Sequence, residues 1–384
     1  MKQLVRKTML ALCLMGLMTT SINAQRKTND LAIVEHPNHK DLKPEIKVAL
    51  LLDTSNSMDG LIDQAKAQLW QIVNELSYAK CEDDKPRLKI ALYEYGNDNL
   101  NAEEGYLRQV LAFSNDLDDI SKELFSLTTN GGNEYCGKVI KSSLDQLNWG
   151  SNEDDLKLIF IAGNEPYTQG NVSYKDASRE ANKNDVTVNT IFCGNYDQGI
   201  ATYWKDGADL TNGSYMAINQ NKSTIHIASP YDKKILELNT KLNNTYVAYG
   251  KRGKQKIAEQ RLQDSNAESY SSANAVSRTV SKSSHLYVNT TWDLVDDEED
   301  VDFSYDSLQK EDLPEHLKGK SVTEIKTFVA KKRKERVEIQ TEIQKLNTKR
   351  KDYILQQQKD NSNGLENAMI KAIKTQALKK NYSW

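Results

Sequence analysis

The chain of 384 residues is polar and mildly acidic. It carries 51 Lys and Arg against 54 Asp and Glu, for a formal net charge of −3. The mean hydropathy of −0.69 excludes a protein that crosses a membrane many times. The excess of acids disfavours nucleic-acid binding, which depends on cationic contacts to phosphate. We therefore expect no nucleic-acid partner, and the length allows one full core plus a second, more polar region.

The first 24 residues have the pattern of a secretory signal peptide. Three basic residues precede an apolar stretch at 9–18, and Ala24 ends a cleavage site. The apolar stretch is too short to span a bilayer comfortably, and a single membrane anchor is the alternative. We expect an exported protein in the periplasm, at the cell surface or secreted, with no membrane span after signal cleavage.

The next part of the chain predicts an α/β domain. Polar residues 25–44 form a short linker, and apolar strand patterns then alternate with helical patterns over 45–220. This alternation indicates a doubly wound, mainly parallel sheet. The predicted strands are 46–52, 88–95, 106–113, 156–162, 186–193 and 214–218. The predicted helices between them lie near 60–79, 116–126, 135–147 and 173–184.

Strand patterns nearly stop after residue 220, which predicts an all-α region over 221–384. Ser229 and Pro230 begin a helix whose apolar stripe continues to Gly250. Later helices are predicted at about 252–282, 321–359 and 363–380. Within the first of these, the Ser/Ala-rich stretch 265–284 is weakly patterned.

The helix at 321–359 has apolar residues near heptad spacing. Lys332, Arg336 and Arg350 interrupt this seam, so we expect a helical hairpin or bundle rather than a long free coiled coil. The acidic run 296–302 lacks the glycine spacing of a Ca²⁺ loop and is interpreted as a solvated loop.

The most informative motif follows the first predicted strand. An apolar run over 46–52 is followed by Asp53, Ser55 and Ser57 at alternate positions. One carboxylate and two hydroxyls on a turn at the carboxyl end of a strand suit a hard divalent cation, because Mg²⁺ and Ca²⁺ prefer oxygen ligands. An amphipathic helix pattern comes next.

This order of strand, oxygen-rich turn and helix resembles the von Willebrand factor A (VWA) domain and its Asp-x-Ser-x-Ser metal-ion-dependent adhesion site (MIDAS). The order and length of the elements over 45–220 fit the resemblance, which implies a VWA/Rossmann-like fold. It also implies that Asp53 acts mainly through water while Ser55 and Ser57 bind the ion directly. The role implied is adhesion or assembly of complexes, not catalysis.

Two further loops match the resembled family in placement but not in residue type. Glu134 stands where the family usually has Thr, and some members use Glu in this loop. Asn164 stands where the family usually has Asp, with Glu165 beside it. The alternative is a sheet that has lost its metal, with Asp53 capping the next helix. The resemblance implies a variant metal site made of Asp53, Ser55, Ser57, Glu134 and Asn164.

Signal cleavage would remove Cys13 and leave an odd number of cysteines, enough for one disulfide at most. In the resembled fold, Cys136 and Cys193 both lie at the edge that carries the metal loops. A disulfide between them would brace the site in an oxidising compartment, and two buried free thiols are the alternative. Cys81 is expected to be a lone thiol.

No catalytic pattern stands out, and we expect a binding protein rather than an enzyme. Gly131 and Gly132 are not followed by the Lys-Ser/Thr of a phosphate loop, and the five His show no paired spacing for zinc. We expect Mg²⁺, or else Mn²⁺ or Ca²⁺, with one open position that a carboxylate of a protein partner completes. The alternatives are a metal-free assembly protein acting through its C-terminal helices, with homo-oligomerisation, and a hydrolase whose ion activates water.

Overall fold

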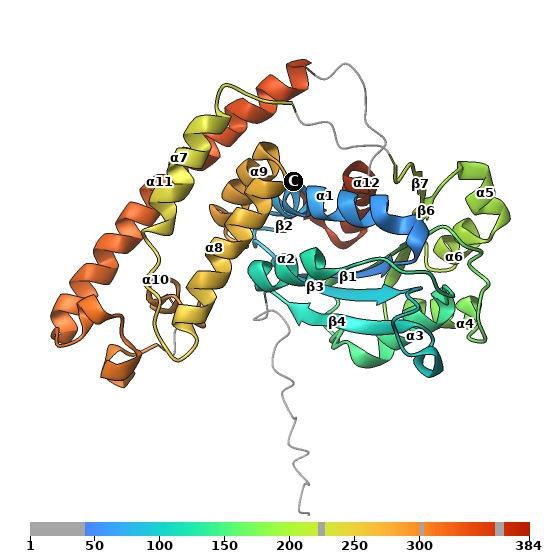
Figure 1. The fold of residues 1–384 in the computed structure, drawn as a ribbon, viewed down its shortest axis with the longest axis horizontal. Helices are drawn as coiled ribbons and strands as arrows, with labels where there is room; N and C mark the ends of the chain where they lie inside the picture. Colours follow the sequence, from blue (N-terminus) through green and yellow to red (C-terminus); the bar gives the residue numbers. More distant parts are fainter. Residues whose placement is uncertain (1–42, 222–226, 300–302, 358–364) are drawn as a thin grey trace, which may run out of the picture. The chain divides into compact units, whose positions relative to one another are not determined.

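A six-stranded sheet with helices on both faces forms the core of the α/β part (Figure 1). The computed structural model describes residues 43–221, 227–299, 303–357 and 365–384. The strand order is β4-β3-β1-β5-β6-β7, and only the β3–β4 pair is antiparallel. This confirms the predicted doubly wound, mainly parallel sheet. The strands are β1 (Glu45–Asp53), β3 (Arg87–Tyr95), β4 (Leu107–Ser114), β5 (Leu156–Gly163), β6 (Thr187–Cys193) and β7 (Tyr215–Ile218).

The central strand β1 is apolar because both of its faces are covered. Val48 and Leu52 pack into the core beneath α1 (Asp59–Leu76). Ala49 and Leu51 point to the other face and join a second core. Since side chains alternate along a strand, one apolar run supplies both layers.

Helices cover each face in a separate layer. One core includes apolar residues of α1, α2 (Leu117–Ser126) and α12 (Leu365–Ala377). The other includes residues of α3 (Cys136–Gln146), α4 (Tyr174–Lys183) and α6 (Trp204–Asp209). The short helix α5 (Tyr196–Ala201) follows the carboxyl end of β6.

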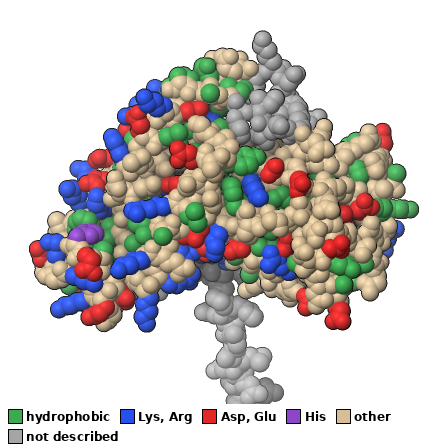
Figure 2. Space-filling model, viewed as in Figure 1, with side chains coloured by type: hydrophobic (Ala, Val, Ile, Leu, Met, Phe, Trp, Pro, Cys, Tyr) green, Lys and Arg blue, Asp and Glu red, His purple; other side chains and the backbone are tan. Residues whose placement is uncertain are grey.

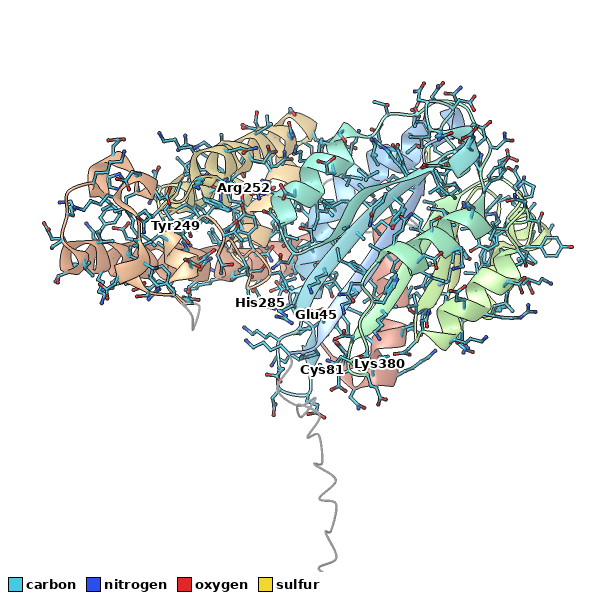
Figure 3. All side chains as sticks on the ribbon, turned by 90° about the horizontal axis from the view of Figure 1, so that it is seen from below. Glu45, Cys81, Tyr249, Arg252, His285 and Lys380 are labelled. Atoms are coloured by element: carbon cyan, nitrogen blue, oxygen red, sulfur yellow. The ribbon has the colours of Figure 1, made fainter. Side chains whose placement is uncertain are left out.

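The end of the chain returns to the sheet, which the sequence pattern does not reveal. Met369 and Ile373 of α12 are buried in the core beneath α1. Beyond α12, β8 (Tyr382–Ser383) pairs antiparallel with β2 (Lys80–Cys81). Figure 3 shows Cys81 and Lys380 close together, and the Cys81 thiol lies 3.9 Å from the Lys380 carbonyl oxygen. The helical region is thus bounded on both sides by elements that pack on one sheet.

That region contains five helices among the described residues beyond 226 and before α12. Helix α11 packs along α7 and also contacts α9, while α9 packs on α8 and on α1 of the sheet layer (Figure 1). This agrees with the expected bundle. The helices are α7 (Asp232–Asn243), α8 (Gly253–Tyr270), α9 (Ser272–Lys282), α10 (Leu294–Asp297) and α11 (Val322–Gln357).

Two predicted helices differ in extent from those observed. The helix expected to reach Gly250 ends at Asn243, because the following backbone pairs elsewhere: the Val247 amide donates to the Asp293 carboxylate at 2.6 Å. The single helix expected over 252–282 is broken at Ser271, whose φ of −168° is extended. The Ser271 hydroxyl caps the next helix by accepting a hydrogen bond from the amide of Asn274.

Two of the three basic residues that interrupt the seam of α11 form buried ion pairs. Arg336 contacts Asp293 and Asp296, both at 2.5 Å, and Arg350 contacts Asp232 of α7 at 2.8 Å. Lys332 instead pairs with Glu335 of the same helix at 3.0 Å. The interpretation of the acidic run 296–302 as solvated is therefore wrong at Asp296, and residues 300–302 lie outside the described part. The breaks at Arg336 and Arg350 mark tertiary contacts.

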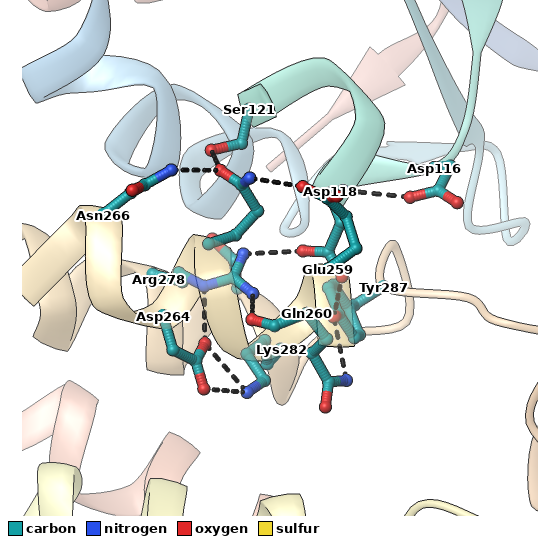
Figure 4. A network of polar contacts seen from close by, with 12 residues as sticks. Asp116, Asp118, Ser121, Glu259, Gln260, Asp264, Asn266, Arg278, Lys282 and Tyr287 are labelled. Carbon is teal, nitrogen blue, oxygen red and sulfur yellow. Dashed lines mark hydrogen bonds and ion pairs between the residues drawn. The ribbon is translucent and has the colours of Figure 1, made fainter. Parts of the chain in front are cut away.

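A buried polar network joins the sheet layer to the helical region (Figure 4). Arg278 of α9 is 1% exposed and contacts Asp118 of α2 at 2.8 Å and Asp264 of α8 at 2.6 Å. Lys282, also buried, contacts Asp264 at 2.9 Å. The weakly patterned stretch 265–284 is thus packed and mostly helical, and its polar side chains share the buried contacts with Val276 and Val280.

The predicted signal peptide, 1–24, and nearly all of the predicted linker lie outside the described residues. In the part of the chain that the structure covers, no helix is both long and apolar enough to cross a membrane.

Candidate metal site

The first motif lies at the carboxyl end of β1, as its sequence position predicts. Asp53 ends the strand, and a short 3₁₀ turn, Asn56–Met58, leads into α1. The Ser55 amide donates a hydrogen bond to Asp53 Oδ1 at 2.7 Å, and the hydroxyls of Ser55 and Ser57 lie 3.2 Å apart. The turn therefore gathers three oxygen-bearing side chains at one point.

The two other predicted loops reach the same place. Asn164 follows β5, and its amide nitrogen donates to the Ser57 hydroxyl at 3.1 Å. Glu134 belongs to the loop between α2 and α3 and lies against Asp53 in the interior. The structure thus brings together all five residues that the resemblance implies. Asp53 and Asn164 meet because the carboxyl ends of the parallel strands β1 and β5 share one edge of the sheet, and the loop between α2 and α3 adds Glu134.

Two glycines make room for the carboxyl groups. A methyl group at Gly96 would lie 2.7 Å from Glu134 Cγ and 2.9 Å from Asp53 Oδ1, and the φ of Gly96 is +79°. A methyl group at Gly163 would lie 2.5 Å from the Tyr95 hydroxyl and 3.1 Å from Asp53 Oδ2. Both closest distances are too short for a real Cβ. The sequence analysis missed these glycines, although each lies at the carboxyl end of a predicted strand.

Asp53 and Glu134 are buried with incomplete hydrogen bonding. Asp53 is fully buried and Glu134 is 3% exposed. Within the described residues, Asp53 Oδ2 and Glu134 Oε2 have no hydrogen-bond partner. Burying a carboxylate oxygen without a hydrogen-bond partner costs free energy. These two oxygens are therefore expected to bind a cation or a proton.

The electrostatics of the pair agree with this requirement. Burial raises the pKa of Asp53, and hydrogen bonds from Ser55 oppose the rise. Burial also raises the pKa of Glu134, and the neighbouring negative charge of Asp53 raises it further. Two carboxyl groups in one buried site resist ionising together, so the site without a cation retains a proton near neutral pH.

The donor set fits a hard divalent ion. It offers two carboxylates, two hydroxyls and one amide oxygen, the ligand types that Mg²⁺ and Ca²⁺ prefer. Across the described residues, no group of three or more His, Cys, Asp or Glu side chains is placed to hold a metal. Hydroxyl and amide oxygens would therefore have to complete the coordination that the two carboxylates begin.

One supporting residue escaped the sequence analysis. Gln169 accepts a hydrogen bond from the Glu134 amide at 3.1 Å and donates one to Glu165 at 3.2 Å. It therefore ties the loop of Glu134 to the loop of Asn164. Glu165 itself is exposed at the rim and adds a further negative charge to the surroundings.

The cysteines are free thiols. Cys81, Cys136 and Cys193 are all buried and unbonded among the described residues. Of the two arrangements that the sequence left open for Cys136 and Cys193, the structure has the buried free thiols and not the disulfide. The Cys136 thiol instead lies 3.9 Å from the Tyr95 hydroxyl, which donates to the Ala162 carbonyl at 2.9 Å.

Replacing Glu134 with Gln is expected to stabilise the metal-free protein at pH 7. Because the pKa of Glu134 is raised by folding, the folded protein holds a proton there that the unfolded chain has lost at this pH. Gln needs no such proton and can still donate to Asp53. We expect a gain of about 1–3 kcal/mol in the free energy of unfolding, measured by urea unfolding in EDTA.

This gain in the free energy of unfolding should be smaller near pH 4.5, because the glutamate of the unfolded chain also binds a proton there. The exposed Glu268 supplies a matched control, since Glu268→Gln changes no buried group. A loss of stability in Glu134→Gln at pH 7 would contradict the interpretation that folding raises the pKa of Glu134.

Comparison with known proteins identifies the α/β part. The family model of the von Willebrand factor type A domain matches residues 47–202. No curated protein sequence matches the chain. Members of this family generally mediate protein–protein interaction, and some bind a metal at a MIDAS.

Several solved structures are similar to part of the chain. The conserved hypothetical protein BatB from Bacteroides thetaiotaomicron is 14% identical, with 45% of this chain and 90% of that chain covered and a TM-score of 0.35. An aerotolerance-related membrane protein from Bacteroides fragilis is 16% identical, with 46% and 93% covered and a TM-score of 0.32. Proximal thread matrix protein 1 from the mussel byssus, with zinc in its MIDAS motif, is 13% identical, with 47% and 43% covered and a TM-score of 0.36. The family match and the sheet topology lead to one conclusion: residues 47–202 of this chain form a von Willebrand factor type A domain.

Proposed function

We propose that this protein recognises a protein partner through a divalent cation held at the edge of its VWA sheet. The observation that supports this most directly is the pair of buried carboxyl groups, Asp53 and Glu134, each with an oxygen that has no hydrogen-bond partner in the described part of the chain. Beside them, Ser57 is exposed and Asn164 is half-buried. The site is therefore negatively charged inside and open to solvent on the side of Ser57.

Each residue has a distinct role in the proposal. Asp53 and Glu134 supply the negative charge that a divalent ion needs, and the hydroxyls of Ser55 and Ser57 supply neutral oxygen ligands. Asn164 offers a further neutral oxygen in place of a carboxylate. Mg²⁺ is the first choice, with Mn²⁺ or Ca²⁺ as alternatives.

The ion would supply the attraction for the partner. The ligands on its open side are neutral hydroxyl and amide oxygens, so the ion could accept an anionic oxygen there. A side-chain carboxylate of the partner has this chemistry and would complete the coordination from the side of Ser57. The signal-peptide pattern of 1–24 supports recognition outside the cytoplasm, in the periplasm or at the cell surface.

The double variant Ser55→Ala/Ser57→Ala tests the site. Calorimetry should find one saturable Mg²⁺ site in the wild type and a loss of about 100-fold or more in affinity in the variant, because it removes two ligand oxygens. The hydroxyls of the exposed Ser126 and Ser269 bond only to nearby backbone carbonyls, so Ser126→Ala/Ser269→Ala is the matched control.

The same calorimetry also distinguishes the proposed function from the alternative, a metal-free assembly protein. A wild type that binds no divalent ion would leave the sheet as a metal-free scaffold and favour assembly through the C-terminal helices. Helix α11 gives that alternative its one specific support, since Val337 and Leu355 are 54% and 68% exposed. Sedimentation of the wild type and of Val337→Asp would then test for homo-oligomers.

A further inference from the structure

A pocket opens between the end of α1, the turn after β2, the end of α9 and helix α11. Its volume is about 290 Å³, and Lys80, Lys85 and His285 are among the residues that line it. His285 contacts Pro86, which precedes β3, whereas Asp53 lies beside the last residue of β3. The pocket therefore lies toward the opposite edge of the sheet from the candidate metal site. We call it the His285 pocket.

Hydrogen bonds hold two sides of the His285 pocket in place. The Gln344 side chain donates to the Ser283 hydroxyl at 2.8 Å, and both residues line the pocket. The half-buried His285 has its Nε2 atom 3.4 Å from the Pro86 carbonyl oxygen. Since a carbonyl only accepts hydrogen bonds, Nε2 is the nitrogen that carries the proton of the neutral ring. The other nitrogen, Nδ1, is left to take up a second proton.

Lysines gather near this ring without acidic partners. Lys80 and Lys85 line the pocket, and neither they nor the nearby Lys43 forms an ion pair with another described residue. Burial lowers the pKa of His285, and the positive charges of Lys85 and Lys43 lower it further, against the hydrogen bond to Pro86. The charges that act on the ring are therefore positive.

The acids nearest to these lysines do not neutralise them. Residues 82–84 are all acidic and exposed, and none of them is among the groups that shift the pKa of His285. At the same edge of the sheet, the buried Glu45 is already paired with Arg87 and Lys89. Within the described part of the chain, the His285 pocket thus has no counterion.

The pocket is a positive exception in an acidic part of the molecule. Residues 45–220 carry 28 Asp and Glu but only 15 Lys and Arg, so the α/β part as a whole repels anions. Figure 2 shows this contrast, with Asp and Glu spread over the α/β part and Lys and Arg gathered over the helical region. Attraction of an anion to the pocket would therefore come from its own cations and not from the net charge of the domain.

We propose that the His285 pocket binds a phosphate group. Cations held together without a counterion repel one another, so an anion that neutralises them binds favourably. Lys80 and Lys85 supply two positive charges, and His285 supplies a third when Nδ1 takes up a proton. A phosphate dianion matches this charge better than a single carboxylate does. The volume lies at the low end for ligand pockets, which suits a small anion.

Inorganic phosphate is the first probe, and the ring signal of His285 in proton NMR, assigned by its loss in His285→Gln, is the readout. In EDTA and at constant ionic strength, phosphate should shift this signal along a saturable curve. It should also raise the pKa of His285 by about one unit, because a bound dianion favours the protonated ring. EDTA keeps the result independent of the metal site.

The double variant Lys80→Gln/Lys85→Gln should bind phosphate about tenfold or more weakly. Lys183 and Lys241 are also exposed and form no ion pair within the described residues, so Lys183→Gln/Lys241→Gln is the matched control. Circular dichroism would establish that both variants fold. Equal affinity of the two double variants would overturn the inference, because the signal would then report general screening by the ion.

The phosphate group can come from a free phosphate or from a lipid headgroup, and vesicles distinguish the two sources. Phosphatidylcholine vesicles with and without phosphatidic acid are sedimented with the protein. Saturable binding of the soluble ion supports a free phosphate. Sedimentation with phosphatidic acid alone, lost in Lys80→Gln/Lys85→Gln, supports a headgroup. Failure of both probes to bind would overturn the inference and leave the proposed function untouched.

Discussion

Mg²⁺ should bind about tenfold more tightly for each unit of pH between 6 and 8, and should release about one proton per ion. The reason lies in the buried carboxyl pair. Burial raises the pKa of both Asp53 and Glu134, and the negative charge of Asp53 raises the pKa of Glu134 further. Near neutral pH the metal-free site holds a proton, which the ion must displace.

The sign of the effect on stability follows from the same shifts. Because both pKa values are raised by folding, the metal-free folded protein binds more protons than the unfolded chain above about pH 4.5. The contribution of the pair to stability is therefore lost as the pH rises toward the folded pKa of Glu134. Saturating Mg²⁺ replaces the proton, so the stability that Mg²⁺ adds should increase with pH.

Calorimetry in two buffers of different ionisation enthalpy measures the protons released. Thermal unfolding at pH 6, 7 and 8, with Mg²⁺ and with EDTA, measures the stability. Asp53→Ala should show no saturable site, and Glu134→Gln should bind Mg²⁺ more weakly with a flatter pH dependence. A Mg²⁺ affinity that is constant from pH 6 to 8 would contradict the expectation that Asp53 and Glu134 hold a proton in the metal-free protein.

Arg278→Ala is expected to destabilise the protein by about 3–5 kcal/mol. Arg278 is 1% exposed and lies between Asp118 and Asp264 (Figure 4). Its guanidinium lies 4.8 Å from the ring centroid of Trp70. Removing it would take the cation from the buried Asp118 and leave Asp264 with Lys282. Because these contacts join α1, α2, α8 and α9, the loss should weaken the attachment of the helical region to the sheet.

Urea unfolding measures the change in free energy, and limited proteolysis reports whether the helical region loosens first. Arg179→Ala is the control, because Arg179 is 58% exposed in its pair with Asp176 and such pairs contribute less than about 1 kcal/mol. Equal effects of the two substitutions would show that the network of Arg278 adds little to stability.

Local pattern was enough to predict the sheet strands of the α/β part and four of its helices, but not α5 and α6. Buried parallel strands are apolar runs because both faces are covered, and each predicted strand overlaps an observed one. The Asp53, Ser55 and Ser57 turn is a local feature too, since all three residues lie within one loop. The placement of Glu134 and Asn164 came from the resemblance to the VWA domain, because neither residue is near the turn in the chain.

The polar stretch 265–284 shows where pattern fails. Its helices are buried through Arg278, Lys282 and their partners as well as through Val276 and Val280, and the ion-paired residues add no apolar period that a pattern could detect. For the same reason, Arg336 and Arg350 appeared to interrupt a seam when they are contacts. The polarity of a residue does not reveal whether a partner distant in the chain will pair with it.

By itself, the sequence determined the order of the sheet strands and of four helices over 45–220, the oxygen-rich turn at Asp53 and the helical character of the rest. Only the tertiary structure decided that α12 returns to the sheet, that Gly96 and Gly163 open space around the carboxyls, and that Gly199 lets α5 lie close to Tyr215 and Phe192. Local order depends on neighbours in the chain, whereas these features depend on close approach between distant segments, which no periodicity records.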